Sequence, residues 1–199
     1  MMNKSNAVTT EHSDQALRIL LQAMQQGEEV GWEAVRLRDI SDRLNIPLSE
    51  IKLYFQQKDD VVDAWFDLAD HAMLACQQRP DFEHSSAQEK LKIAILHWLN
   101  AMAAHRKLTK QMLYYKLEPG HIHLQAAALL RLSRTVQWLR ELADLKAKNL
   151  KRIEQELFLS SLFSSTFICW LQAKDPAQQA ATKWLESGLK LGRWRQLWH

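Results

Sequence analysis

Few residues of this chain of 199 residues have the types and spacing that metal or redox chemistry requires. His121 and His123 are two residues apart, and Glu118 is the only carboxylate beside them. Side chains two apart on a helix do not face each other, and no further ligand at metal-binding spacing accompanies them. Cys76 and Cys169 lie far apart in apolar helical patterns, which is typical of small core residues in a reducing compartment. We therefore expect no metal site, no disulfide and no cofactor.

The sequence also lacks the motifs on which enzyme active sites commonly depend. It contains no glycine-rich phosphate loop, no nucleophile elbow and no His-Glu metal signature. Five glycines leave few of the tight loops that usually carry catalytic residues. We expect a protein that is not an enzyme.

Hydropathy indicates a soluble protein. The apolar run at 157–171 is interrupted by four serines and is shorter than the roughly 20 residues that a membrane span needs. Residues 1–10 are polar and lack the apolar core of a secretory signal. A cytoplasmic location is therefore expected.

Cationic side chains that could contact phosphate occur at Arg36, Arg38, Lys52 and Lys58. The segment that carries them, residues 1–60, has seven Lys and Arg against ten Asp and Glu, a balance of −3, whereas the whole chain carries +3. The basic excess therefore lies in the rest of the chain. Phosphate binding by the four cations would depend on their clustering on one face, because local charge sets the contact energy.

Helices must position these side chains. Apolar residues recur three and four apart almost everywhere, and no run of alternating β-branched residues is present. A first helix is expected to begin near Ser13 or Asp14, either of which can cap it, and to end before Gly31. Short helices at 37–44 and 47–55 follow. Between them Asn45 tolerates a left-handed turn and Pro47 suits a first helical turn, so the pair forms a helix-turn-helix.

The remaining helices are longer and more apolar. They are predicted at 58–78, 87–105, 107–117, 121–142, 150–173 and 177–191, with breaks at 79–86, 119–120, 146–149 and 175–176. The expected fold is therefore all-α, with about nine helices. A three-helix domain, residues 1–58, precedes a larger helical domain, residues 59–199.

Residues 31–65 contain a motif defined by residue types at fixed spacing: Gly31-Trp32, Ile40, Asn45-Ile46, Tyr54-Phe55, Lys58 and Asp59-Asp60. With these residues the segment resembles the N-terminal domain of the TetR/AcrR family of bacterial transcriptional regulators. The resemblance implies a homodimer whose two helix-turn-helix heads read half-sites of double-stranded operator DNA one helical turn apart. It also implies that residues 59–199 bind a small ligand and dimerise, and that the chain is a repressor released by ligand.

The resemblance places the DNA-binding residues around the second short helix: Arg36, Arg38, Ser49, Glu50, Lys52, Leu53, Tyr54 and Lys58. Lys58 can reach a phosphate or cap the preceding helix. Glu50 would face DNA, where a carboxylate either accepts a hydrogen bond from a cytosine amino group or repels phosphate. A helix-turn-helix retained only as a structural unit is the alternative to a working DNA-binding head.

Large apolar side chains are abundant after residue 60, since the chain has eight Trp, six Met and six Phe. The expected walls of the ligand site are Trp65, Trp98, Met102, Met112, Tyr115, Trp138, Phe167 and Trp170. A pocket takes the character of its walls, so the ligand is expected to be apolar or aromatic. For each of these residues, ordinary core packing is the alternative.

The helices at 150–173 and 177–191 lie where members of the resembled family form a four-helix bundle with a partner subunit. The expected dimer interface contains Ser161, Ser164, Ser165 and Trp184, because small residues at helical spacing let helices approach closely. An intramolecular core contact is the alternative.

The last twelve residues, GLKLGRWRQLWH, combine Lys190, Arg193 and Arg195 with Trp194 and Trp198. Such a mixture can lie at a membrane surface. It supports a second function, that of a lipid-binding protein of the TetR fold, similar to one of ubiquinone biosynthesis, which touches membranes with its last helix and does not bind DNA.

Overall fold

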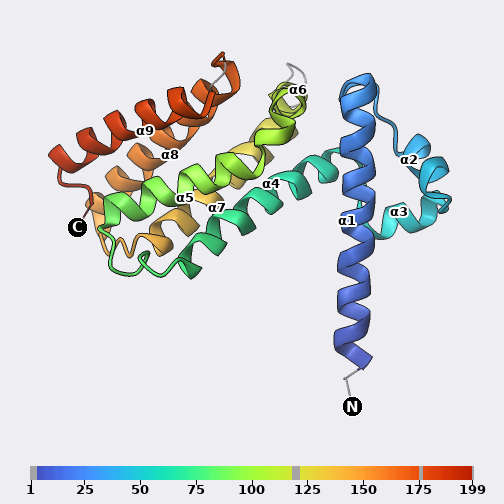
Figure 1. The fold of residues 1–199 in the computed structure, drawn as a ribbon, viewed down its shortest axis with the longest axis horizontal. Helices are drawn as coiled ribbons and strands as arrows, with labels where there is room; N and C mark the ends of the chain where they lie inside the picture. Colours follow the sequence, from blue (N-terminus) through green and yellow to red (C-terminus); the bar gives the residue numbers. More distant parts are fainter. Residues whose placement is uncertain (1–3, 118–121, 175–176, 199) are drawn as a thin grey trace. The chain divides into compact units, whose positions relative to one another are not determined.

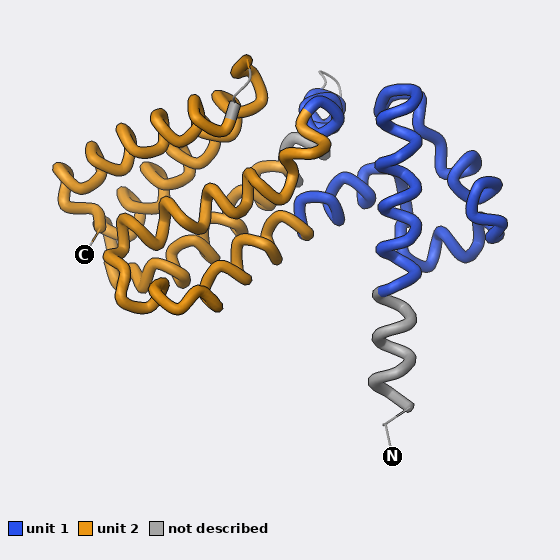
Figure 2. Tube along the Cα trace, in the orientation of Figure 1, with its two compact units in different colours: residues 1–67, 107–118 blue, residues 68–106, 119–199 orange. Residues whose placement is uncertain are grey.

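The computed structural model describes the backbone of residues 4–117, 122–174 and 177–198, and the side chains of 14–117, 128–174 and 178–198. Within these residues the chain is helical and contains no strand (Figure 1). It divides into two compact units, residues 1–67 with 107–118 (unit 1) and residues 68–106 with 119–199 (unit 2) (Figure 2). The predicted all-α fold is confirmed.

The described helices are α1 (Lys4–Val30), α2 (Leu37–Leu44), α3 (Leu48–Tyr54), α4 (Lys58–Ala75), α5 (Ala87–Ala101), α6 (Arg106–Leu117), α7 (Ile122–Leu142), α8 (Asn149–Gln172) and α9 (Ala177–Trp194). Short 3₁₀ turns follow α4 at Cys76–Gln78 and α5 at Ala103–His105. The second turn divides the helix predicted at 87–105. The predicted breaks at 119–120 and 175–176 lie outside the described residues.

The predicted start of the first helix was wrong. The helix begins at Lys4 rather than near Ser13 or Asp14. Residues 4–13 contain neither Pro nor Gly, so nothing stops the helix from extending past those two potential caps. The last helix also runs three residues beyond its predicted end, to Trp194.

Unit 1 is built around the inner face of α1, where Ile19, Leu20, Ala23 and Met24 are buried with Ile40 of α2 and Ile51 of α3. Helix α6 also belongs to this unit. A Cβ on Gly27 of α1 would lie 2.7 Å from Leu108 Cδ1 of α6, so a larger residue at this position would require the Leu108 side chain to shift. Gly31 then ends the helix with φ +83°, and the Trp32 amide donates to Gln111 Oε1 of α6 at 2.7 Å.

A buried ion cluster joins α6 to the start of α4 within unit 1. Lys116 Nζ lies 2.8 Å from Asp59 Oδ2 and 2.9 Å from Asp63 Oδ1, and the Lys116 side chain is only 2% exposed. Nearby, Trp65 Nε1 donates to Thr109 Oγ1 at 3.0 Å. These contacts cross long sequence separations, so they fix α6 as part of the helix-turn-helix head.

Unit 2 contains α5, α7, α8 and α9 (Figure 1) together with the end of α4. The Trp98 ring of α5 makes edge contacts with Phe163 and Phe167 of α8, with ring centroids 4.8 and 5.0 Å apart. Its indole N–H donates to Asp70 Oδ1 at 2.7 Å. Asp70 also accepts from Arg131 Nη2 at 3.0 Å, so an aromatic core and a largely buried ion pair meet at Trp98.

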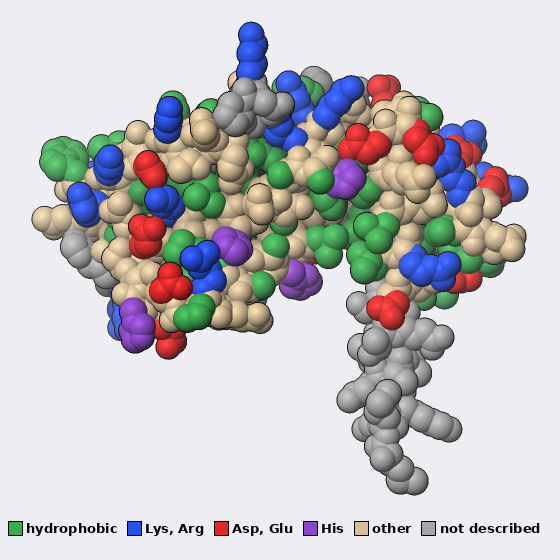
Figure 3. Space-filling view, viewed as in Figure 1, with side chains coloured by type: hydrophobic (Ala, Val, Ile, Leu, Met, Phe, Trp, Pro, Cys, Tyr) green, Lys and Arg blue, Asp and Glu red, His purple; other side chains and the backbone are tan. Residues whose placement is uncertain are grey.

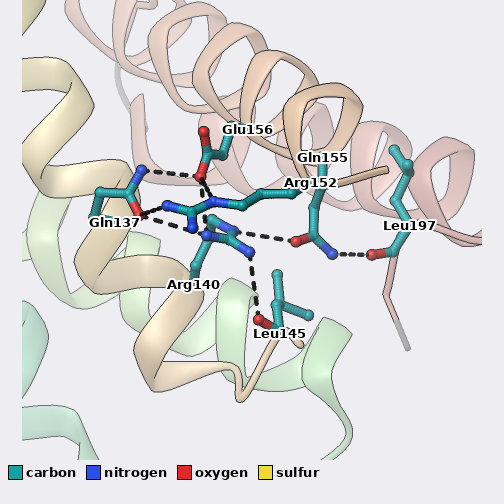
Figure 4. A network of polar contacts seen from close by, with 7 residues as sticks. All are labelled: Gln137, Arg140, Leu145, Arg152, Gln155, Glu156 and Leu197. Atoms are coloured by element: carbon teal, nitrogen blue, oxygen red, sulfur yellow. Dashed lines mark hydrogen bonds and ion pairs between the residues drawn. The ribbon is translucent and has the colours of Figure 1, made fainter. Parts of the chain in front are cut away.

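A polar network holds the end of the chain against α7 and α8 (Figure 4). Buried Arg140 donates to Gln155 Oε1 at 3.1 Å and to Glu156 Oε1 at 2.9 Å. Gln155 Nε2 in turn donates to the carbonyl oxygen of Leu197. The contacts leave the buried Arg140 guanidinium paired, as a buried charge requires.

The stability of the protein is expected to fall as the pH is lowered from 7 to 5. Burial, and secondarily the charge of Arg79, lower the pKa of His97 on α5. Below about pH 6.5 the unfolded chain then binds more protons at this position than the folded chain, so stability rises with pH. Urea unfolding of the wild type and of His97→Gln at both pH values measures this effect. The free energy of unfolding should fall less between pH 7 and pH 5 in the variant than in the wild type. Equal falls would show that His97 does not contribute to the pH dependence of stability.

Candidate nucleic-acid interface

The turn between α2 and α3 has the geometry of a helix-turn-helix. Asn45 adopts φ 52° and ψ 43°, the left-handed conformation predicted for it. Ser41 fixes the turn, because its hydroxyl donates to the Ile46 carbonyl oxygen at 2.6 Å and its own carbonyl accepts from the Ile46 amide at 3.1 Å. Pro47 occupies the position before the first residue of α3, where an extended backbone starts the helix.

One side of α3 is anchored and the other is open to solvent. Ile51 is buried, whereas Ser49, Lys52 and Leu53 are exposed, Leu53 by 70%. Tyr54 is half-buried at the end of the helix. A helix that presents a polar and a cationic side chain three positions apart, beside an exposed leucine, offers groups for both phosphate and base contacts.

The two arginines before and within α2 are exposed and differ in their partners. Arg38 forms a surface ion pair with Asp42, at 3.4 Å. Arg36, at the N-cap of α2, has no ion-pair partner among the described residues, and the same holds for Lys52. Figure 3 shows acidic and basic side chains interspersed on the visible face of the molecule, so local cations rather than a uniform field must provide any phosphate binding.

Acidic side chains of unit 1 are engaged by neighbouring groups. Glu29 pairs with Arg43 at 2.7 Å, and this hydrogen bond lowers the pKa of the Glu29 carboxyl group. Glu50, half-buried in the first turn of α3, accepts a hydrogen bond from Gln15 Nε2 of α1 at 2.8 Å. No local pattern in the sequence indicates this role of Gln15, because Gln15 and Glu50 are 35 positions apart.

Lys58 points into unit 1. Its ammonium group donates to the Glu33 carbonyl oxygen at 2.9 Å and lies 5.2 Å from the Trp32 ring centroid and 5.0 Å from that of Tyr115. Burial lowers the pKa of the Lys58 amino group. The lysine therefore joins α4, α6 and the turn after α1.

The residues predicted to line a ligand site are divided between the two units. Trp65, Met112 and Tyr115 belong to unit 1, whereas the others belong to unit 2. In unit 2, Trp98, Met102, Phe167 and Trp170 are buried, and the Phe167 and Trp170 rings stack with centroids 6.0 Å apart. Trp138 is 50% exposed. The structure thus brings Trp98, Phe167 and Trp170 together but leaves Trp138 at the surface.

The residues predicted for a dimer interface lie on the outer side of α8 and α9. Ser161 is exposed, Ser164 and Ser165 are half-buried, and Trp184 is 52% exposed. Trp184 Nε1 donates to Ser165 Oγ at 3.0 Å, which links the two helices. An apolar stripe on α8 that was not among the predicted interface residues is also exposed, at helical spacing with Ser161: Leu150, Ile153, Leu157 and Ile168.

The C-terminal tail packs back on unit 2. Leu197 and Trp198 are buried, and Trp198 Nε1 donates to the Leu189 carbonyl oxygen at 2.9 Å. Arg195 pairs with Glu154 of α8 at 2.7 Å. Trp194 is 80% exposed, so only part of the basic aromatic tail faces solvent.

No metal-binding group of three or more His, Cys, Asp or Glu occurs among the residues whose side chains are described. The side chains of His121, His123 and Glu118 lie outside them. Cys76 and Cys169 are free thiols; burial raises the pKa of Cys76 to about 11. None of the helices, as far as the structure describes them, is long and apolar enough to cross a membrane.

The solved structures similar to this chain include two bacterial regulators. The TetR transcriptional regulator from Nitrosomonas europaea is 38% identical to it, covers 91% of this chain and 99% of its own, and superposes with a TM-score of 0.80. A bacterial regulatory protein of the TetR family from Rhodococcus RHA1 is 18% identical over 88% of this chain and 95% of its own, with a TM-score of 0.48. No protein-family model and no curated protein sequence matches the chain.

Proposed function

Because the chain belongs to the TetR/AcrR family of transcriptional regulators, we propose that it binds operator DNA as a homodimer and releases it when a small ligand binds. The observation that carries the proposal is the solvent-exposed side of α3, with Ser49, Lys52 and Leu53 following the left-handed turn at Asn45. In a helix-turn-helix the second helix enters the major groove, and its exposed side chains contact base edges and phosphates.

The residues predicted to contact DNA have separate roles in this proposal. Lys52 and Arg36 bind phosphates, and Arg38 exchanges the weak surface pair with Asp42 for a phosphate. Ser49 and Tyr54 donate hydrogen bonds to the backbone of the DNA, and Leu53 contacts the methyl group of a thymine. For Lys58 the contacts with Glu33, Trp32 and Tyr115 support a positioning role within the head rather than a phosphate contact.

Replacing Lys52 with alanine is expected to weaken DNA binding similarly for all sequences and to reduce its salt dependence. Each neutralised phosphate contributes about 0.9 to the slope of log K against log salt, so losing one contact in each of two heads should lower the slope by about 2. Fluorescence anisotropy with an operator fragment at several salt concentrations measures both quantities. Lys107→Ala, on the exposed side of α6, is the matched control. An unchanged affinity and slope for Lys52→Ala would remove Lys52 from the interface.

The homodimer is supported by the apolar stripe on α8. Leu150, Ile153, Leu157 and Ile168 present large apolar side chains to solvent in the single chain, and exposed patches of this kind mark association sites. A two-fold axis would pair the stripe with itself and bring Ser161, Ser164, Ser165 and Trp184 into the same interface.

For the ligand we propose an apolar or aromatic molecule bound in unit 2 near Trp98, Met102, Phe167 and Trp170. The aromatic and sulfur-containing surfaces of these residues favour such a molecule. The Asp70–Arg131 ion pair beside Trp98 offers a hydrogen-bonding partner for one polar group of the ligand. Helix α4 contributes residues to both units, so it provides a continuous path from the ligand domain to the head.

The alternative of a lipid-binding protein at a membrane surface depends on a tail that is available to lipid. The burial of Leu197 and Trp198, and the ion pair between Arg195 and Glu154, support a structural role for the tail instead. We therefore favour a regulator that acts on DNA in the cytoplasm.

A further inference from the structure

A hydrogen-bonded chain of three side chains connects the outer surface of α1 to the start of α3. Arg18 Nη1 donates to Gln15 Oε1 at 2.9 Å, and Gln15 Nε2 donates to Glu50 Oε1 at 2.8 Å. Arg18 is exposed, whereas Gln15 and Glu50 are half-buried. All three residues belong to unit 1.

The order of these groups fixes the orientation of the central amide. The guanidinium group of Arg18 can only donate, and the carboxylate of Glu50 can only accept. Gln15 must therefore turn its oxygen to Arg18 and its nitrogen to Glu50. The carboxylate of Glu50 is in this way restrained before any ligand approaches, which reduces the entropy lost on binding.

The restrained carboxylate keeps one oxygen for another donor. Gln15 occupies Oε1, and Oε2 has no hydrogen-bond partner among the described residues. Glu50 lies between Ser49 and Ile51 in the first turn of α3, beside the side chains that face solvent. A carboxylate at the N-terminal end of a helix in the major groove can accept a hydrogen bond from the exocyclic amino group of cytosine.

The same three hydrogen-bonded side chains reduce the repulsion between Glu50 and phosphate. Arg18 carries a positive charge on the surface and is linked to Glu50 through one amide, so it opposes part of the repulsion at low salt. A free glutamate on this helix would lower the affinity for any DNA, because it repels the backbone regardless of sequence.

We propose that Glu50 reads a cytosine in each half-site of the operator and that Gln15 and Arg18 are its positioning residues. This inference rests on the proposed function, since it requires that α3 enters the major groove. It assigns two positioning residues to α1, a helix that carries none of the residues assigned to DNA contact above.

Selection of binding sites from random double-stranded DNA by the purified full chain tests the proposal. The wild type should enrich an inverted repeat with cytosine favoured about tenfold at one position of each half-site. Glu50→Gln should transfer the preference at that position to adenine, because a glutamine pairs with the adenine edge. Gln15→Leu, which removes the donor but keeps a similar size, should weaken the cytosine preference several-fold and leave the other positions unchanged. Glu33→Gln, with the same change in charge on an exposed turn, is the control and should select the wild-type sequence.

The alternatives give different results. If Glu50→Gln binds all sequences more tightly with unchanged base preferences, Glu50 only repels phosphate and the proposal is overturned. If Glu50→Gln changes the preference but Gln15→Leu does not, Gln15 has no positioning role. If the wild type enriches no sequence, the proposed function itself fails, and the role of Glu50 fails with it.

Discussion

Replacing Lys116 with methionine is expected to lower the free energy of unfolding by about 3–5 kcal/mol, because it leaves the buried carboxylate of Asp59 without its counter-charge. Lys116 is 2% exposed and is the cation for both Asp59 and Asp63, whose side chains are 7% and 34% exposed. Asp59 Oδ1 is already buried without a hydrogen-bond partner among the described residues. Equilibrium urea unfolding, followed by circular dichroism, measures the loss.

Two further variants separate the effect of charge from that of packing. Lys107→Met, on the same helix but exposed, should change stability by less than about 0.5 kcal/mol. The triple variant Lys116→Met, Asp59→Asn, Asp63→Asn should recover part of the stability, because it removes the uncompensated charges but leaves a buried amide at position 59 without a partner. A triple variant as unstable as Lys116→Met would show that the loss comes from packing rather than from charge.

Replacing Leu157 with glutamate is expected to convert a dimer into a monomer. Leu157 is 65% exposed in the single chain and lies in the middle of the apolar stripe on α8. Burial of one leucine contributes about 1.5–3 kcal/mol, and a two-fold interface contains the residue twice. Dissociation should therefore become at least about 100-fold more favourable. Sedimentation equilibrium should give twice the chain mass of 23.2 kDa for the wild type and the single mass for the variant.

Loss of the dimer should also weaken binding to an inverted repeat, because a monomer holds only one half-site. Leu21→Glu makes the same exchange at an exposed position of α1, in the other unit, and should stay dimeric. A Leu157→Glu protein that sediments like the wild type would place the interface elsewhere.

The helix-turn-helix could be predicted from the sequence because its signals are local. Asn45 and Pro47 act through their own backbone conformations, and the spacing of Ile40 and Ile51 already indicates one buried face. The start of α1 could not be predicted in the same way. Ser13 and Asp14 can cap a helix, but they can also lie within one when no Pro or Gly precedes them.

Contacts between residues far apart along the chain could not be predicted, because a single sequence contains no pattern that links them. Lys116 is a buried ion-pair partner 57 positions from Asp59, yet the pattern of α6 alone makes it another surface lysine. Gln15 and Glu50 meet only because α1 and α3 pack together. The exposure of Trp138 also had no signal in the sequence: helical spacing and residue type indicated a wall of the ligand site, and the structure leaves half of the side chain in solvent.

The most direct test of the account is selection of genomic DNA fragments by the purified full chain over a range of salt concentrations, with anionic liposomes in a parallel assay. We expect enrichment of fragments that carry an inverted repeat with half-sites one helical turn apart, an affinity that falls as salt increases, and no binding to liposomes. Absence of any enriched fragment at the lowest salt, together with liposome binding that is lost when residues 188–199 are removed, would contradict it and assign the fold to a lipid-binding role.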